Sequence, residues 1–202
     1  MGLTTKEAIE LRRSIRKYKD KDLSDEIIHE LIDSARLAPS GCNSQPWRFK
    51  IVRDPEIKKR LAVAAHNQKF VSEAPVVLVC CLDVKGYLDG TVSGLQDLEE
   101  QQVIDERIYT LLIKNAADSR KLSVENIISR TSFNVAIAIE HIVLRALDFG
   151  LGTCWVRLVD GLQVRKIFDW DENISVVALL PVGYPDEDPK PRKRLELEDI
   201  LL

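Results

Sequence analysis

The sequence predicts a single three-layer domain of the α+β class, with helices on both faces of one sheet. Its 202 residues suit one domain with a complete core. Strands and helices follow one another in mixed order, which favours a layered arrangement over a bundle or a barrel. Residues 76–82 are continuously apolar and rich in valine, as is typical of a central strand that is covered on both faces. A doubly wound sheet is the alternative that this order leaves open.

Composition and charge indicate a soluble globular protein. Hydrophobic residues make up 45% and charged residues 30% of the chain, and the net charge is −3. This balance gives no overall positive field to attract nucleic acid or an anionic membrane. The apolar run at residues 133–147 is interrupted by charges and is shorter than the roughly 20 residues that a membrane span needs. The N-terminus has no apolar core of signal-peptide length, so we expect a cytoplasmic protein without nucleic-acid or membrane partners.

Two helices are predicted in the first 40 residues by their capping signals. Thr4 and Glu7 fit a capping box that opens a helix running to about residue 12 or 13. Ser24 is the N-cap of a second helix, which Pro39 ends. Apolar residues at helical spacing follow Ser24, so this helix has one face directed to the core.

The next segments alternate between strand and helix patterns. Residues 47–51 alternate apolar and basic side chains, which predicts a half-buried strand. Asp54 followed by Pro55 predicts the start of a third helix. Residues 94–129 have a charged, mostly helical pattern, and we expect them to form an excursion from the single domain. This excursion is interpreted as a lid over the substrate or as a surface packed across a dimer interface.

The C-terminal part is predicted to contain one long helix and two further strands. The long helix ends at Gly150, a plausible left-handed C-cap. The segments expected are a helix at 132–149, a strand at 153–159, a short helix at 162–168 and a buried strand at 174–182. From residue 186 the chain is charged and rich in proline, so we expect an extended tail that lies across another part of the molecule.

Sequence motifs for side-chain catalysis or nucleotide binding are missing. The sequence has neither the glycine-rich dinucleotide fingerprint nor the P-loop pattern nor a nucleophile elbow. Its three histidines, interpreted as structural or surface residues, are His29, His66 and His141. Its four cysteines, interpreted as buried or half-buried free thiols without a metal, are Cys42, Cys80, Cys81 and Cys154. The chemistry is therefore expected to belong to a bound cofactor.

Two segments of the chain favour an anionic, flat ligand. Residues 12–18, Arg-Arg-Ser-Ile-Arg-Lys-Tyr, bring guanidinium groups together where a helix ends, an arrangement suited to a dianionic phosphate. Residues 38–47, Ala-Pro-Ser-Gly-Cys-Asn-Ser-Gln-Pro-Trp, form a small polar loop that offers backbone N–H groups and amides at close range. From charge and composition alone, a solvated basic helix face and an ordinary turn remain the alternatives.

These two segments, together with later ones, resemble the nitroreductase family of FMN-dependent enzymes. The family's Gly-Leu-Gly-[Ser/Thr]-Cys-Trp segment is matched by residues 150–155. Its closing Gly-Tyr-Pro and basic tail are matched by residues 183–185 and 192–194. The matches occur in order from Arg12 to Arg194, although residues 94–129 are not covered. The resemblance implies a three-layer α-β-α fold with a mainly antiparallel sheet and an intertwined homodimer that has FMN sites at the subunit interface.

The resemblance also implies which residues bind the cofactor. Arg16 is expected at the pyrimidine edge, where negative charge builds when the flavin is reduced. Asn67 is expected to bond the flavin ring. The phosphate and ribityl chain are assigned to Arg12, Arg13 and Ser14, with Arg192 and Arg194 returning to the phosphate. The loop residues expected to approach from the other subunit are Pro39, Ser40, Gly41 and Asn43.

Residues 154–158 are expected to pass the central flavin ring. The resemblance assigns Cys154, Trp155, Arg157 and Leu158 to the cofactor site, with a backbone N–H near Arg157 directed at flavin N5. Many relatives have glycine or glutamate followed by glycine where this chain has Arg157 and Leu158. Glu140 and His141 also replace the family's common Gln-Asn pair. These departures affect the expected substrate more than the expected cofactor.

The function implied is that of a flavin oxidoreductase with a ping-pong mechanism. NADH or NADPH would give a hydride to FMN, and a small nitro, quinone or flavin-type acceptor would then take two electrons. No side chain is required as a general acid or base. Two alternatives remain: a specialised enzyme of the same fold, such as a reductive dehalogenase or a flavin-consuming enzyme, and a non-catalytic module that binds flavin or other anions.

Overall fold

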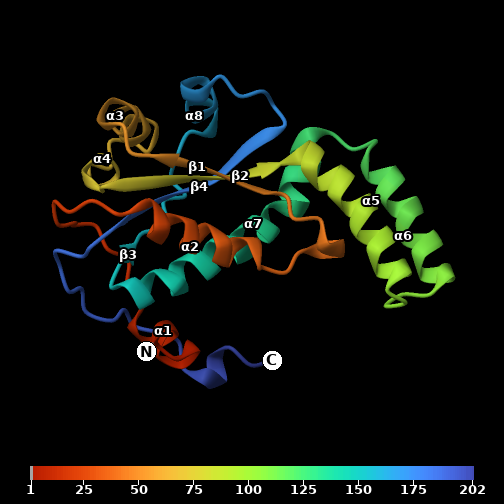
Figure 1. The fold of residues 1–202 in the computed structure, drawn as a ribbon, viewed down its shortest axis with the longest axis horizontal. Helices are drawn as coiled ribbons and strands as arrows, with labels where there is room; N and C mark the ends of the chain where they lie inside the picture. Colours follow the sequence, from red (N-terminus) through yellow and green to blue (C-terminus); the bar gives the residue numbers. More distant parts are fainter. Residues whose placement is uncertain (1) are drawn as a thin grey trace.

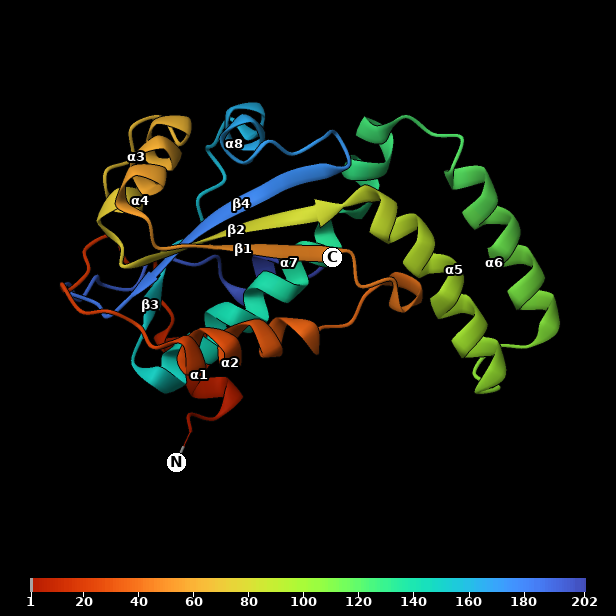
Figure 2. The same ribbon diagram turned by 45° about the horizontal axis from the view of Figure 1, so that its top comes forward.

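The chain forms three layers, with one sheet between two groups of helices. The computed structural model describes residues 2–202. Helices α2 (Asp25–Arg36) and α7 (Val124–Ala146) cover one face of the sheet, and α3, α4 and α8 cover the other (Figure 2). The remaining helices are α1 (Thr5–Leu11), α3 (Pro55–Ala64), α4 (Phe70–Glu73), α5 (Val84–Glu100), α6 (Glu106–Ser119) and α8 (Gly161–Phe168). The predicted α+β class is confirmed, and the doubly wound alternative is excluded by the sheet described next.

The sheet is antiparallel at every pairing. Within residues 2–202, the strands β1 (Trp47–Val52), β2 (Val76–Asp83), β3 (Gly152–Thr153) and β4 (Ile174–Gly183) form a four-stranded sheet in the order β1-β2-β4-β3. Central β2 is buried along nearly its whole length, as its continuous apolar run predicted. Figure 1 shows β2 and β4 side by side at the centre, with α7 running beneath them.

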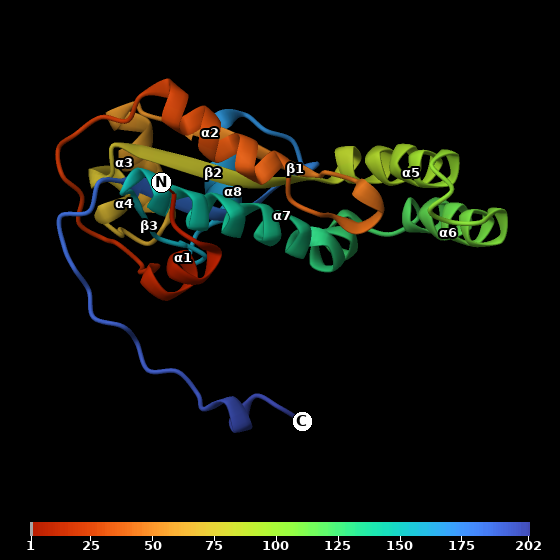
Figure 3. The same cartoon turned by 60° about the horizontal axis from the view of Figure 1, so that its bottom comes forward.

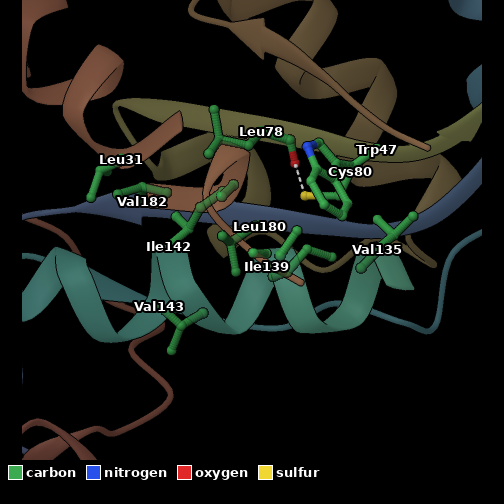
Figure 4. Close-up of a cluster of buried hydrophobic side chains, with 14 of the residues drawn as sticks. Leu31, Trp47, Leu78, Cys80, Val135, Ile139, Ile142, Val143, Leu180 and Val182 are labelled. Carbon is green, nitrogen blue, oxygen red and sulfur yellow. Dashed lines mark hydrogen bonds between the residues drawn. The ribbon is translucent and has the colours of Figure 1, made fainter. Parts of the chain in front are cut away.

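The sheet divides the core into two parts. Cys80 belongs to the cluster that packs against α2 and α7, and Cys81 belongs to the cluster on the α3 and α8 side. Adjacent strand residues point to opposite faces, which explains why the two thiols lie in different clusters. Side chains of the first cluster fill the space between α7 and the sheet, and Figure 4 labels Trp47, Leu78, Cys80, Val135, Ile139, Ile142, Leu180 and Val182 there. Leu31 of α2 and Val143 of α7 belong to the same cluster, and Val143 lies on the side of α7 away from the sheet. All four cysteines are free thiols, three of them buried and Cys42 partly exposed.

The predicted helix starts are confirmed by their capping contacts. The Thr4 backbone N–H donates to Glu7 at 2.7 Å, and the Glu7 N–H donates back to the Thr4 hydroxyl at 3.3 Å. Ser24 accepts from the Ile27 N–H, and Asp54 accepts from the Ile57 N–H. Gly150 adopts φ 66° after the short 3-10 turn Leu147–Phe149, and it is the left-handed cap that the sequence predicted.

The strand predicted at residues 153–159 is wrong in its extent. Only Gly152–Thr153 forms a regular strand, and Val156 makes an isolated bridge to Leu179 of β4. Between them the Cys154 N–H donates to the carbonyl of Pro181 at 3.3 Å. Proline has no N–H to donate in return, so the ladder is interrupted opposite Cys154. The remaining residues run alongside β4 as an irregular segment.

The long helix begins earlier than predicted, at Val124 and not at residue 132. Ser123 caps it by accepting from the Asn126 N–H at 3.3 Å. A polar residue just before position 132 is accommodated inside the helix, since the Thr131 hydroxyl donates to the Ile127 carbonyl at 2.7 Å. The helical stretch Val124–Phe149 is long and apolar enough by length and composition to cross a membrane. Its apolar face is the one packed against the sheet and α2.

Two segments extend away from the layers. Helices α5 and α6 form an antiparallel pair that projects beyond the end of the sheet, and the C-terminal tail is extended apart from the 3-10 turn Leu197–Asp199 (Figure 3). The helical excursion predicted at 94–129 therefore begins earlier, at Val84, directly after β2.

Candidate active site

The two basic clusters of the sequence line the same pocket. This pocket has a volume of about 560 Å³. One wall comes from the end of α1 and the segment after it, and the other comes from the start of the C-terminal tail. The lining residues are Ile9, Glu10, Arg12, Arg13, Ser14, Arg16, Pro189, Lys190, Pro191, Arg192 and Arg194. All five arginine and serine positions predicted for a phosphate are among them, together with Arg16.

The arginines that line this pocket have no carboxylate partner. Elsewhere in residues 2–202, five of the ten other arginines form ion pairs with aspartate or glutamate, namely Arg36, Arg48, Arg53, Arg120 and Arg145. Within residues 2–202, no ion pair involves the arginines that line the pocket, and Glu10 is the only acidic residue in its lining. Arg13 donates only to backbone carbonyls, at 2.7 and 2.8 Å. Clustered and unpaired guanidinium groups repel one another, so this pocket is suited to a multivalent anion.

Backbone contacts bring the two walls together. The Ile15 N–H donates to the Thr153 carbonyl at 2.9 Å, which attaches the arginine segment to β3. The Asp186 N–H donates to the Lys17 carbonyl at 2.9 Å. The Glu187 carboxylate accepts from the backbone N–H groups of Arg16 and Lys17. The tail is therefore held against the arginine segment before it reaches Lys190, and this explains why residues so distant in sequence share a pocket.

The polar loop at residues 39–43 lies away from this pocket in the same chain. It follows α2 and forms the 3-10 turn Gly41–Asn43 beside α5, at the end of the layers opposite to α1 (Figure 1). Pro39, Gly41 and Asn43 are exposed, and Ser40 is half-buried. One chain thus does not bring the predicted loop residues and the predicted arginines together.

Residues 154–158, which were predicted to pass the flavin ring, directly follow β3. Cys154 is buried, and Trp155 is half-buried with its indole N–H 3.3 Å from a Glu140 carboxylate oxygen. Arg157 and Leu158 are exposed. In the described part of the chain, the Arg157 backbone N–H has no acceptor, whereas the Val156 N–H donates to Leu179. A free donor is therefore present at the predicted position.

Asn67 and Arg16 lie near the same turn between α3 and α4. Asn67 is exposed, has φ 60°, and donates its N–H to the Ala62 carbonyl at 2.9 Å. The Arg16 guanidinium lies 5.9 Å from the centre of the Phe70 ring. The Gln68 side chain donates to the Leu158 carbonyl at 3.2 Å, which ties this turn to the segment at 154–158. Three separate segments predicted for the cofactor are therefore connected here.

Burial controls the ionisable groups behind the pocket. It raises the pKa of the Cys154 thiol, against the opposing influence of Arg16 and Arg12. It also raises the pKa of Tyr18, whose hydroxyl donates to the Ile15 carbonyl at 2.7 Å. Both groups stay neutral near pH 7, so neither is a candidate nucleophile or base.

Some residues of the site were not singled out from the sequence. Glu187 and Gln68 form hydrogen bonds to backbone atoms that are distant in sequence. A polar residue in a charged tail or after a helix gives no sequence signal for such a long-range hydrogen bond. Lys190 belongs to the basic tail, and its place in the pocket depends on the bend that Glu187 fixes. The interpretation of His141 as structural is supported, since its Nδ1 lies 3.1 Å from the Ser34 carbonyl.

Comparison with known proteins identifies the family. The model of the nitroreductase family matches residues 9–184, which include the arginine segment, the polar loop and β4. The chain belongs to the nitroreductase family. Nitroreductases are oxidoreductases, and membership therefore favours an enzyme over a non-catalytic binding module. The basic tail after residue 184 lies outside the matched region, so its position beside Arg12 is known from the structure alone.

Several relatives share nearly the whole length of this nitroreductase. An NADH dehydrogenase of Thermus thermophilus is 32% identical over 203 residues, covering 99% of this chain and 96% of the relative. An iodotyrosine deiodinase of Thermotoga neapolitana is 30% identical, and the alignment covers 90% of this chain and 88% of the relative. The structure of a nitroreductase family protein of Streptococcus pneumoniae has a TM-score of 0.79 at 25% identity, and the match covers 98% of this chain and 99% of that structure. A structure from Exiguobacterium sibiricum is described as a nitroreductase in complex with FMN. It has a TM-score of 0.82 at 22% identity, and the match covers 100% of this chain and 97% of that structure.

Proposed function

We propose that this nitroreductase is an FMN-dependent enzyme that oxidises NADH or NADPH and reduces small nitro, quinone or flavin-type acceptors by a ping-pong mechanism. We place it in the cytoplasm as a homodimer. The observation that carries the proposal is the pocket of unpaired arginines formed by two distant segments. The structure of a relative with FMN, and the NADH and NAD(P)H in the names of relatives, support the choice of cofactor and electron donor.

The donor set of the pocket fits the phosphate of FMN. Arg12, Arg192 and Arg194 would neutralise the dianionic phosphate, and Ser14 would add a hydroxyl donor. Arg16 also lines the pocket and would stabilise negative charge on the pyrimidine ring. The free backbone N–H of Arg157 would donate to flavin N5. When bound, FMN supplies the two-electron chemistry between the nicotinamide and the acceptor.

A second copy of the chain would complete the site. The loop at residues 39–43 lies far from the pocket in one chain, so its expected approach to the flavin requires a partner subunit. Large apolar side chains are exposed, including Leu37 (64%), Phe133 (56%) and Leu158 (64%). Apolar surface of this kind favours an interface. The tail adds the exposed apolar residues Leu195, Leu197, Ile200 and Leu201.

The direct test is an absorption spectrum of the purified protein, followed by anaerobic titration with NADH and NADPH. We expect a yellow protein whose flavin absorption is bleached by one or both nucleotides. A nitro compound or a quinone should then restore the colour, with ping-pong kinetics in steady state. A colourless protein that does not take up FMN contradicts the proposal.

The arginine pocket is tested by replacing its two walls together. The double variant Arg12→Ala, Arg194→Ala should lose FMN affinity by about a hundredfold or more, since each charge-assisted contact contributes roughly 1.5–3 kcal/mol. Arg36→Ala is the matched control, because Arg36 pairs with Asp33 at an exposed helix surface. Unchanged affinity in the double variant, with its oligomeric state preserved, rejects the phosphate assignment.

Reductive dehalogenation is the second candidate, and the 30% identity to an iodotyrosine deiodinase favours it. Exposed Arg157 and the α5–α6 pair would then select an anionic halogenated substrate. Release of iodide from iodotyrosine, compared with turnover of a nitro compound under the same conditions, distinguishes the two activities.

A further inference from the structure

Two glycines of α5 lie against the backbone of the polar loop. A Cβ atom on Gly94 would lie 1.8 Å from the carbonyl oxygen of Cys42, and one on Gly90 would lie 2.2 Å from the carbonyl oxygen of Ser44. Both distances are far below any contact that a real Cβ atom makes. The opposing atoms are backbone, so they cannot rotate away as a side chain can. Only glycine allows α5 and the loop to approach this closely.

The spacing of these glycines shows that the contact is a continuous one. Residues four apart lie on the same face of a helix, so Gly90 and Gly94 present one smooth strip to the loop. Glycine is unfavourable in the interior of a helix, and two glycines on one face weaken α5 unless another contact compensates. The close contact with the loop is the compensation that the structure offers.

The loop itself adopts a strained conformation that needs such support. Cys42, Asn43 and Gln45 have φ of 50°, 49° and 45°, a left-handed backbone that is unfavourable for residues with a Cβ atom. Strain of this kind persists only where the surroundings fix it, and it concentrates at ligand sites.

The other side of the loop is held by α7. The Gly41 N–H donates to the Asn134 side-chain oxygen at 3.0 Å, and the Asn134 amide donates to the Thr131 carbonyl at 2.9 Å. Asn134 is almost fully buried. The loop is thus fixed between α5 and α7, while its outer residues Pro39, Gly41 and Asn43 stay exposed.

We infer that Gly90 and Gly94 of α5, together with Asn134 of α7, are positioning residues. They hold residues 40–45 of the polar loop in the conformation needed to contact FMN. This inference rests on the proposed function. It also gives the α5–α6 pair a role besides that of a wall or lid, because the middle of α5 supports the loop.

The test compares Gly94→Ala and Gly90→Ala with Gly161→Ala in the full-length protein. Gly161 is also helical, but its added Cβ would be 3.6 Å from the nearest atom, an ordinary contact. Two quantities are measured: FMN affinity from flavin fluorescence, and the rate at which a disulfide reagent labels Cys42 in the folded apoprotein. Cys42 is a suitable reporter, because it lies in the loop and the other three cysteines are buried. Thermal unfolding and gel filtration verify that each variant is folded and has the wild-type oligomeric state.

We expect the α5 variants to bind FMN about tenfold or more weakly and to label Cys42 several times faster, with Gly161→Ala unchanged in both. Asn134→Ala should have the same two effects, and it keeps the test valid if an α5 variant does not fold. Unchanged FMN affinity in folded α5 variants overturns the inference, whether or not Cys42 labels faster. Failure of the wild-type protein to bind FMN rejects the proposed function instead, and with it the assignment of the loop to the flavin.

Discussion

Gly150 ends the helical stretch after α7 at φ 66°, and apart from its two neighbours in the chain no residue has an atom within 4 Å of the position a Cβ would take. Gly150→Ala should therefore cost only the backbone penalty of the left-handed conformation, about 1 kcal/mol of the free energy of unfolding. Gly150→Asn should cost less, because asparagine tolerates this conformation better. Urea unfolding at fixed protein and FMN concentrations measures both values. Gly161→Ala is the control and should not reduce the free energy of unfolding. Equal free energies of unfolding for Gly150→Ala and the wild-type protein would contradict the cap assignment.

Cys42 should be the first cysteine to react in the native protein, and its reactivity should depend on pH in a particular way. Burial raises the pKa of the Cys42 thiol. Because the thiolate is the reactive form, a raised pKa leaves less of it at pH 8 than a free cysteine has. The labelling rate should therefore be lower than that of a small thiol at pH 8 and should still increase at a pH where the small thiol has reached its plateau. A rate that levels off near pH 8 would indicate an activated thiol instead.

Helix α3 offers a clean comparison of buried and exposed positions within one element. Leu61 is fully buried between α3 and the sheet, whereas Val63, two residues later, is largely exposed. Leu61→Ala should reduce the free energy of unfolding by about 2–5 kcal/mol, since it leaves a cavity in the core. Val63→Ala should change it by less than about 0.5 kcal/mol. Similar losses at both positions would mean that Val63 is covered by a partner subunit.

Elements were predictable from the sequence where their signals are local. The caps at Thr4, Ser24 and Asp54 act within a few residues, and each was found where predicted. The strand expected at 153–159 failed because its pairing depends on Pro181, nearly 30 residues away and without an N–H.

The missed first half of α5 has a different cause. Glycines within residues 84–94 give a weak helix signal by intrinsic propensity. Two of them, Gly90 and Gly94, serve a contact with a loop some 50 residues earlier in the chain. A residue chosen for a tertiary contact contradicts the local rule, so the sequence-based prediction started the excursion ten residues late. The same contact is what makes these glycines candidates for positioning the site.

At the scale of the whole molecule, the basic residues were identifiable from composition, but their assembly was not. The sequence alone fits equally well with a solvated end of the chain for the four basic tail residues, Lys190, Arg192, Lys193 and Arg194. Their place beside Arg12 depends on the Tyr18–Pro185 bridge and on the Glu187 contacts, which join segments about 170 residues apart. The sharing of the site between two chains stays a prediction, and it has a decisive test.

Two variants that each fail to bind FMN should restore one another when their subunits are combined. One carries Arg12→Ala and Arg194→Ala; the other carries Gly41→Trp, which places a large ring on an exposed loop position. If the arginines of one subunit and the loop of its partner form each site, the mixed dimer contains one intact site and one doubly defective site. Mixed dimers isolated with two different affinity tags should then bind about one FMN per dimer, while both parent dimers bind none. If each subunit instead used its own arginines and loop, neither site of the mixed dimer would be intact, and an FMN content near zero would reject the shared site.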